Sequence, residues 1–109
     1  MLMDSREENG KLVLCLEQER LDSAIAVDFK NALFSHIDNG QTRIVFDMSN
    51  IKFVDSSGLG ALVSALKKIG GTGELCVSCV NPAVMTVFEM TRLNKVFKIH
   101  EDTDTAVAA

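Results

Sequence analysis

Two adjacent serines, Ser56 and Ser57, are the side chains of this sequence best placed to do chemistry. They follow Asp55 and precede Gly58, at the expected junction between a strand-like segment and a helix. The first N–H groups of a helix have no partner inside it, so a serine oxygen can accept from them as an N-cap. Replacing such a cap by alanine costs about 1 kcal/mol. Which serine caps the helix stays open, and the other is then free to react.

The residues around the pair do not support a catalytic serine. A nucleophile elbow has the pattern Gly-x-Ser-x-Gly, and Asp55 stands where Ser57 would need a glycine. A serine nucleophile also needs a base, and nothing places His36 or His100 near the pair. A dinucleotide-binding loop would need its third glycine where Val63 stands. We therefore expect a protein that is not an enzyme and uses no cofactor.

A hydroxyl without a base of its own can receive a phosphoryl group from another protein. The N-terminus of a helix suits the product, because unpaired N–H groups and the positive end of the dipole favour an anion. About two added negative charges beside Asp55 would disfavour a protein packed on this surface. Because about 1.4 kcal/mol is a factor of ten in affinity, phosphorylation here would be sufficient to release a partner.

The three cysteines predict neither a metal site nor a disulfide framework. Cys76 and Cys79 form a C-x-x-C pair, but a zinc site of this type needs a second pair. A redox pair begins a helix, whereas this pair lies in a strand-like segment. We expect both residues, and Cys15 in an earlier apolar run, to be small buried hydrophobes. Reduced thiols, with no secretion signal and no apolar run of about 20 residues, favour the cytoplasm without membrane insertion.

Composition limits the class of protein further. The 109 residues include 15 acidic and 11 basic side chains, for a formal charge of −4, and 47% are hydrophobic. These values are typical of one globular domain over residues 1–109 that needs no disulfide or metal. Nucleic-acid binding is disfavoured, because it requires clustered Lys and Arg and exposed aromatic rings, and the chain has neither Trp nor Tyr.

The elements that must position the serine pair alternate between strands and helices. A hairpin turn is expected at Asn9-Gly10, and the first helix is expected to run from a cap at Asp22 or Ser23 to about Asp38. Asn81-Pro82 is a second helix start. The predicted strands cover residues 2–7, 11–17, 43–48, 51–54, 74–80 and 96–99, and the later helices cover 59–69, after the serine pair and Gly58, 82–91 and 103–109. This alternation predicts an α/β domain with mostly parallel strands and an antiparallel N-terminal edge.

Several segments, taken together, resemble the STAS-domain anti-sigma factor antagonists of bacteria. The strongest is FVDSSGLGAL at residues 53–62, which is similar to the family's phosphorylation loop and the helix after it. Further matches are GEL at 73–75, NPAV at 81–84, FEMTRL at 88–93, FKI at 97–99 and, more weakly, RLD at 20–22. Glu19, where the family often has glycine, and the short segment 101–109 depart from the pattern without touching the loop.

The resemblance implies a STAS-like single domain, with a mixed, mostly parallel sheet of about five strands and three to four helices. It also implies a cytoplasmic partner-switching protein of bacterial transcription regulation, including stress responses. In that family the unphosphorylated antagonist binds an anti-sigma factor serine kinase and so frees the sigma factor. The kinase phosphorylates the first serine of the loop, which is Ser56 here, and a PP2C-type phosphatase removes the group.

The same resemblance implies a surface for the partner and leaves two other functions open. The expected partner-binding residues are Asp22, Asp55, Ser57, Gly58, Leu59 and Gly60. We expect a monomer or a weak dimer. The first alternative is a STAS scaffold or transport-system subunit that binds a partner without a phosphorylation switch. The second is a nucleotide or small-molecule binder that uses the helix N-terminus as an anion site.

Overall fold

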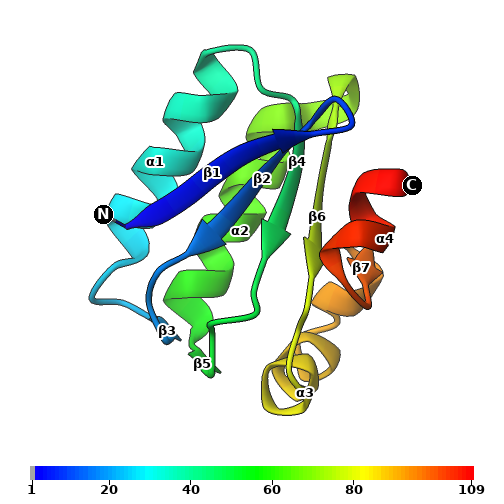
Figure 1. Ribbon diagram of the computed structural model, residues 1–109. Coiled ribbons are helices and arrows are strands. Elements are labelled where there is room, and N and C mark those ends of the chain that lie inside the picture. Colours follow the sequence, from blue (N-terminus) through cyan, green and yellow to red (C-terminus); the bar gives the residue numbers. More distant parts are fainter. Residues whose placement is uncertain (1) are drawn as a thin grey trace.

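The computed structural model describes residues 2–109, which form a five-stranded main sheet and four α-helices. The strand order is β1-β2-β4-β6-β7, with β1 antiparallel to β2 and the other neighbours parallel (Figure 1). This confirms the predicted α/β class with a mixed, mostly parallel sheet. The strands are β1 (Met3–Glu8), β2 (Lys11–Leu16), β4 (Arg43–Asp47), β6 (Glu74–Ser78) and β7 (Ile99–His100). The helices are α1 (Ala26–Asp38), α2 (Ser56–Ile69), α3 (Pro82–Met90) and α4 (Thr103–Ala108).

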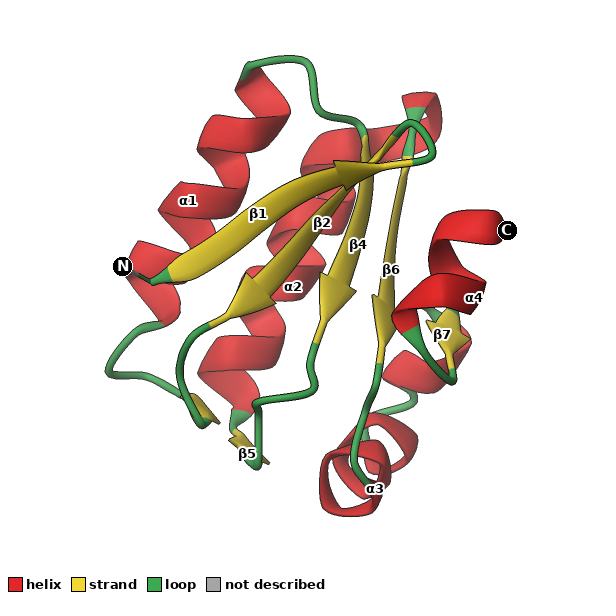
Figure 2. Cartoon of the chain, viewed as in Figure 1, coloured by secondary structure: helices red, strands yellow, loops and turns green. Residues whose placement is uncertain are grey.

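A second, two-stranded sheet pairs β3 (Arg20–Leu21) with β5 (Phe53–Val54) in parallel. It lies beyond the carboxyl ends of β2 and β4, next to the start of α2 (Figure 2). The sequence predicted a strand-like segment at 51–54 but no strand at 20–21, because two residues are too few to show a period. This pairing brings the segment before α1 to the serine pair.

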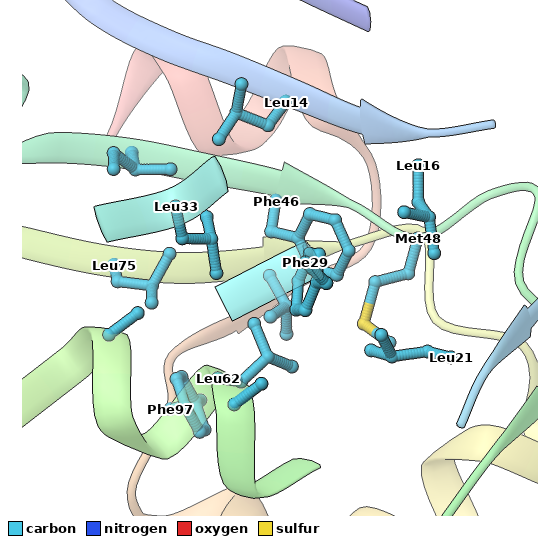
Figure 3. Packing of buried hydrophobic residues seen from close by; sticks show 14 of the residues in the cluster. Leu14, Leu16, Leu21, Phe29, Leu33, Phe46, Met48, Leu62, Leu75 and Phe97 are labelled. Carbon is cyan, nitrogen blue, oxygen red and sulfur yellow. The ribbon is translucent and has the colours of Figure 1, made fainter. Parts of the chain in front are cut away.

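Helices α1 and α2 cover one face of the main sheet and enclose the core (Figure 1). The predicted helical spacing of Phe29, Leu33 and Ile37 is confirmed, because all three are buried there. Leu14 and Phe46 from the sheet meet them (Figure 3), and the ring centroids of Phe29 and Phe46 are 5.1 Å apart. Because α2 itself packs on this close-packed core, the position of its first turn is fixed.

Helix α4 covers part of the opposite face of the sheet. Its Ala106 and Val107 pack on Val13, Val45 and Cys76, which alternate with the core-facing residues of their strands. The predicted helix at 103–109 is thus confirmed, and it buries a second, smaller apolar cluster.

Polar contacts hold both ends of α4 to the sheet. At its N-terminus, the Thr103 hydroxyl donates to Asp47 Oδ2 at 3.0 Å and lies 2.8 Å from the buried Ser78 hydroxyl. At its other end, the buried Lys11 Nζ donates to two backbone carbonyl oxygens at 3.0 and 2.8 Å. These contacts join residues far apart in sequence, so no local pattern predicted them.

Helix α1 begins later than the sequence predicted. Neither Asp22 nor Ser23 is its N-cap, because the first helical residue is Ala26 and Ile25 occupies the cap position without a side-chain cap. Asp22 instead accepts from the N–H of Ala24 at 3.1 Å, which closes a turn before the helix. A short polar side chain serves this purpose as readily as it caps a helix.

Two other predicted boundaries agree with the structure, and the last predicted strand does not. Asn9 and Gly10 form the expected hairpin turn with positive φ values of 52° and 78°. Asn81 Oδ1 accepts from the Val84 N–H at 2.8 Å, as expected of the cap before Pro82. The last strand is β7 rather than 96–99, because a 3-10 turn over Leu93–Lys95 delays it.

The cysteines match the expectation in part. Cys76 is buried, but Cys15 and Cys79 are half-buried, so the expectation of burial is wrong for these two. Cys15 lies outside the cluster that α4 covers, and Cys79 follows the end of β6 with a positive φ of 59°. Over residues 2–109, no helix combines the length and apolar character needed to cross a membrane.

Candidate functional site

The serine pair forms the first turn of α2. Strand β5 ends at Val54, Asp55 is extended with φ −124°, and the helix begins at Ser56. Both Ser56 and Ser57 are exposed. Among residues 2–109, neither serine hydroxyl has a hydrogen-bond partner in the structure. Each hydroxyl is therefore open to a reagent from solvent.

The cap of α2 is Asp55, so the expectation that one serine caps this helix is wrong. Its Oδ1 accepts from the backbone N–H of Gly58 at 2.9 Å. Aspartate is as good an N-cap as serine, and its negative charge is favourable at the positive end of the helix dipole. Because Asp55 takes the capping role, Ser56 and Ser57 both keep free hydroxyls.

The second oxygen of Asp55 contacts a different part of the chain. Oδ2 accepts from the backbone N–H of Ser23 at 3.0 Å, in the turn before α1. In the same turn Asp22 Oδ2 accepts from the Arg20 guanidinium at 3.0 Å. The structure therefore brings Asp22 and Asp55, which are 33 residues apart in sequence, to the same end of the molecule.

The surroundings of Asp55 stabilise its charged form. The hydrogen bond from the Gly58 N–H holds the pKa of Asp55 below its usual value of 3.8. Desolvation opposes this shift, while the N–H groups of Ser23 and Ser57 and the charge of Arg20 support it. Asp55 thus carries a negative charge beside Ser56 at neutral pH.

The predicted partner-binding residues divide into exposed and covered ones. Gly58 packs against the backbone of Leu21, and Leu59 is 3% exposed within the core. Ser57 and Gly60 are exposed on α2. Asp22 and Asp55 are half-buried beside them, while Gly58 and Leu59 are buried and support this surface from beneath.

Two shallow grooves flank the exposed face of α2, and the sequence did not predict them. Ser57 borders the groove toward α1, together with Val27, which is 65% exposed, and Lys30. Ser56 borders the groove on the other side, together with Lys67 at its far end. Helical spacing could have predicted which α2 residues share a face and line the grooves. The lining residues from other elements become neighbours of α2 only in the folded chain.

An aromatic ring and a cation lie on the strand pair beside the serines. The guanidinium carbon of Arg20 lies 4.1 Å from the centroid of the Phe53 ring, which is 41% exposed. The parallel register pairs Arg20 with Phe53, so this contact follows from the β3–β5 pairing. No signal in the sequence pointed to it, because β3 itself was not predicted.

Taken together, the site is an exposed hydroxyl pair at a helix N-terminus, with two carboxylates and a stacked cation nearby. Among residues 2–109, no group of three or more His, Cys, Asp or Glu side chains is arranged to hold a metal ion. What the arrangement offers chemically is a pair of accessible alcohol groups on a polar surface.

Comparison with known proteins gives relatives over most of the chain. The STAS domain family matches residues 3–106. BtrV of Bordetella bronchiseptica, named as a candidate anti-sigma factor antagonist, is 29% identical over 102 residues, which are 93% of this chain and 87% of that protein. The crystal structure of a candidate anti-sigma factor antagonist from Thermotoga maritima has a TM-score of 0.86 at 25% identity, covering 97% of this chain and 92% of that one.

A third similarity concerns the fold. The structure of the Bacillus cell fate determinant SpoIIAA in its phosphorylated form has a TM-score of 0.72 at 18% identity and covers 97% of this chain and 96% of that chain. The family match over residues 3–106 and the agreement of the folds lead to one conclusion: this chain belongs to the STAS domain family, in which the two relatives from Bordetella and Thermotoga bear the name anti-sigma factor antagonist.

Proposed function

We propose that this chain is a binding module switched by phosphorylation of Ser56. Its unmodified form binds an anti-sigma factor serine kinase and thereby releases the sigma factor, and the phosphorylated form does not bind. The observation that carries the proposal is the exposed, unbonded hydroxyl of Ser56 at the N-terminus of α2. In this proposal residues 1–109 act as one cytoplasmic STAS domain, a monomer or weak dimer, with no catalytic residue or cofactor of its own.

The proposed switch begins with transfer of a phosphoryl group. A bond forms between Ser56 Oγ and the γ-phosphorus of ATP, and the bond from that phosphorus to the leaving oxygen of ADP breaks. The hydroxyl proton passes to a base supplied by the kinase or to solvent. A PP2C-type phosphatase reverses the modification. In that reaction water attacks the phosphorus, the serine hydroxyl is restored and inorganic phosphate is released.

The electrostatics of the site support release of the partner. The phosphoryl group adds about two negative charges next to the ionised Asp55. Asp22 lies in the adjoining turn, and its partner Arg20 is already bonded to it. A partner surface that packs on the unmodified serine therefore meets uncompensated charge after phosphorylation, which costs several kcal/mol, roughly two or more powers of ten in affinity.

Ser56 and Ser57 differ in what lies beside them, which supports Ser56 as the phosphorylated residue. Ser57 borders the groove between α1 and α2, together with Val27 and Lys30. Ser56 is the first residue of the helix and borders the opposite groove. The family resemblance assigns the modification to the first serine, and a kinase approaching along the axis of α2 meets this one first.

Phosphopeptide mapping tests the proposal directly. The full chain is incubated with a purified anti-sigma factor serine kinase of the same organism and ATP, and residues 53–67 are mapped by mass spectrometry. We expect one phosphoryl group on Ser56, retained in the matched control Ser57→Ala and lost in Ser56→Ala. An unmodified chain under conditions where the two proteins bind would overturn the switch and favour a scaffold without one.

A further inference from the structure

The carboxylate of Asp55 joins two segments that lie on the proposed docking face. One oxygen accepts from the Gly58 N–H at 2.9 Å within α2, and the other accepts from the Ser23 N–H at 3.0 Å in the turn before α1. The two donors are 35 residues apart in sequence. One side chain therefore caps the helix that begins with Ser56 and also fixes the turn that carries Asp22.

Leu21, the residue before this turn, is fixed to β5 and to the start of α2. There the β3–β5 pairing sets Leu21 beside Val54, and the Asp55 N–H donates to the Leu21 carbonyl oxygen at 3.2 Å. Gly58 also packs on the Leu21 backbone. After Leu21, a single hydrogen bond among residues 2–109 links this turn to the start of α2, and it runs from the Ser23 N–H to Asp55.

The hydrogen bonds of Asp22 itself stay within its own segment. Oδ1 accepts from the Ala24 N–H at 3.1 Å, and Oδ2 accepts from Arg20 Nε at 3.0 Å. On the other side of the turn, the Ile25 N–H donates to the Asp22 carbonyl oxygen at 3.1 Å, which ties the turn to the start of α1 and not to α2. Among residues 2–109, Asp22 therefore makes no hydrogen bond of its own to α2, and the bond from the neighbouring Ser23 to Asp55 supplies that link.

We propose that Asp55 is the positioning residue of the docking face: its carboxylate holds the turn over residues 22–24 in register with Ser56, so that a partner meets both as one surface. The inference rests on the proposed function for its consequence in binding, but the positioning itself is a property of the free protein. Asp55 acts here through Ser23 and need not touch the partner.

An asparagine at this position separates the two roles of Asp55. Its Oδ1 can still cap α2, because asparagine is an N-cap of equal quality. Its other terminal atom is an NH₂ group, which donates and cannot accept from the Ser23 N–H. Asp55→Asn therefore keeps the helix cap and removes the link to the turn. Asp102→Asn is the matched control, because Asp102 caps α4 through the Thr105 N–H at 2.7 Å.

Amide hydrogen exchange in the full chain tests the positioning. In Asp55→Asn we expect the Ser23 amide to exchange about tenfold faster or more, since a hydrogen bond to a charged group is lost, with the amides of α2 little changed. Asp102→Asn should leave Ser23 as in the wild type. If Asp55→Asn does not fold, Asp55→Ser serves instead, because its hydroxyl can cap α2 and is too short to reach Ser23. Equal Ser23 exchange in the variant and the wild type would overturn the proposal.

A double-mutant cycle tests the consequence for binding to the purified anti-sigma factor serine kinase. We expect Asp22→Ala to weaken binding in the wild type and to weaken it at least threefold less when Asp55 is already asparagine, although the two side chains share no hydrogen bond among those of the structure. Strictly additive losses would show that Asp55 does not position Asp22 and would overturn the inference. If the wild type binds no kinase, the proposed function fails, while the Ser23 exchange still decides the positioning.

Discussion

Gly58 in the first turn of α2 lies directly against the backbone carbonyl of Leu21 in β3. A Cβ atom on Gly58 would overlap the Leu21 carbonyl oxygen and would lie 2.8 Å from its carbonyl carbon. Real side-chain carbons do not come this close, so only glycine lets the helix start and the β3 strand meet here. The close approach of these two backbones sets the spacing between the serine pair and Leu21, the residue that precedes the turn.

Substitutions at two glycines of α2 should therefore have opposite effects on stability. Gly58→Ala should lower the free energy of unfolding by about 1 to 3 kcal/mol, because the new methyl group forces β3 away from the helix. Gly60→Ala is the matched control: its Cβ would meet nothing within 4 Å, so the better helix former should raise stability by about 0.5 to 1 kcal/mol. Urea unfolding of both variants measures this, and a Gly58→Ala protein as stable as the wild type would contradict the packing described.

The ammonium group of Lys11 should be needed to hold the carboxyl end of α4. Lys11 is 3% exposed, and its Nζ bonds the carbonyl oxygens of Ala106 and Ala109 and lies 3.1 Å from Glu74 Oε1. Lys11→Met keeps the apolar stem and removes the donor, so we expect a loss of about 1 to 3 kcal/mol in unfolding free energy.

The control for this prediction is the same change at an exposed lysine. Lys95→Met should stay within about 0.5 kcal/mol of the wild type. Hydrogen exchange localises the effect, since the amides of α4 should exchange faster in Lys11→Met than in Lys95→Met. Equal losses in both variants would mean that Lys11 does not hold the helix.

Acid should remove the stabilising contribution of the Asp55 charge. Because the Gly58 N–H lowers the pKa of Asp55 in the folded state, folding is favoured by the ionised form at pH values above 3.8, and this contribution is lost as the pH falls through the lowered folded pKa. We therefore expect the stability gap between the wild type and Asp55→Asn to be largest near neutral pH and to shrink below about pH 4. A gap that stays constant down to about pH 2 would contradict the role of the charge.

The sequence predicted the elements with local signals and missed those set by tertiary contacts. The four-residue spacing of Phe29, Leu33 and Ile37 identified α1, and Asn81-Pro82 identified the start of α3. Strand β3 left no trace, because two residues gain their strand character from pairing with β5. The contacts of Thr103 with Ser78 and Asp47 were equally invisible, since they join α4 to two strands.

The candidate site shows the same division. The serine pair and its place before a helix followed from the order of residues 53–60, whereas the identity of the cap did not, because aspartate and serine are equivalent in that role. That Asp55 bonds Ser23, and that Arg20 stacks on Phe53, depends on how β3 and β5 pair. Sequence alone therefore predicted where the serine pair lies but not the contacts that surround it.

The affinity of the anti-sigma factor serine kinase for two forms of this chain, unmodified and phosphorylated on Ser56, tests the central claim most directly. Calorimetry should give binding for the unmodified protein and for Ser56→Ala, and binding at least about a hundredfold weaker for the phosphorylated protein, with Ser56→Asp also weakened. Equal affinities for the unmodified and phosphorylated forms would contradict the account.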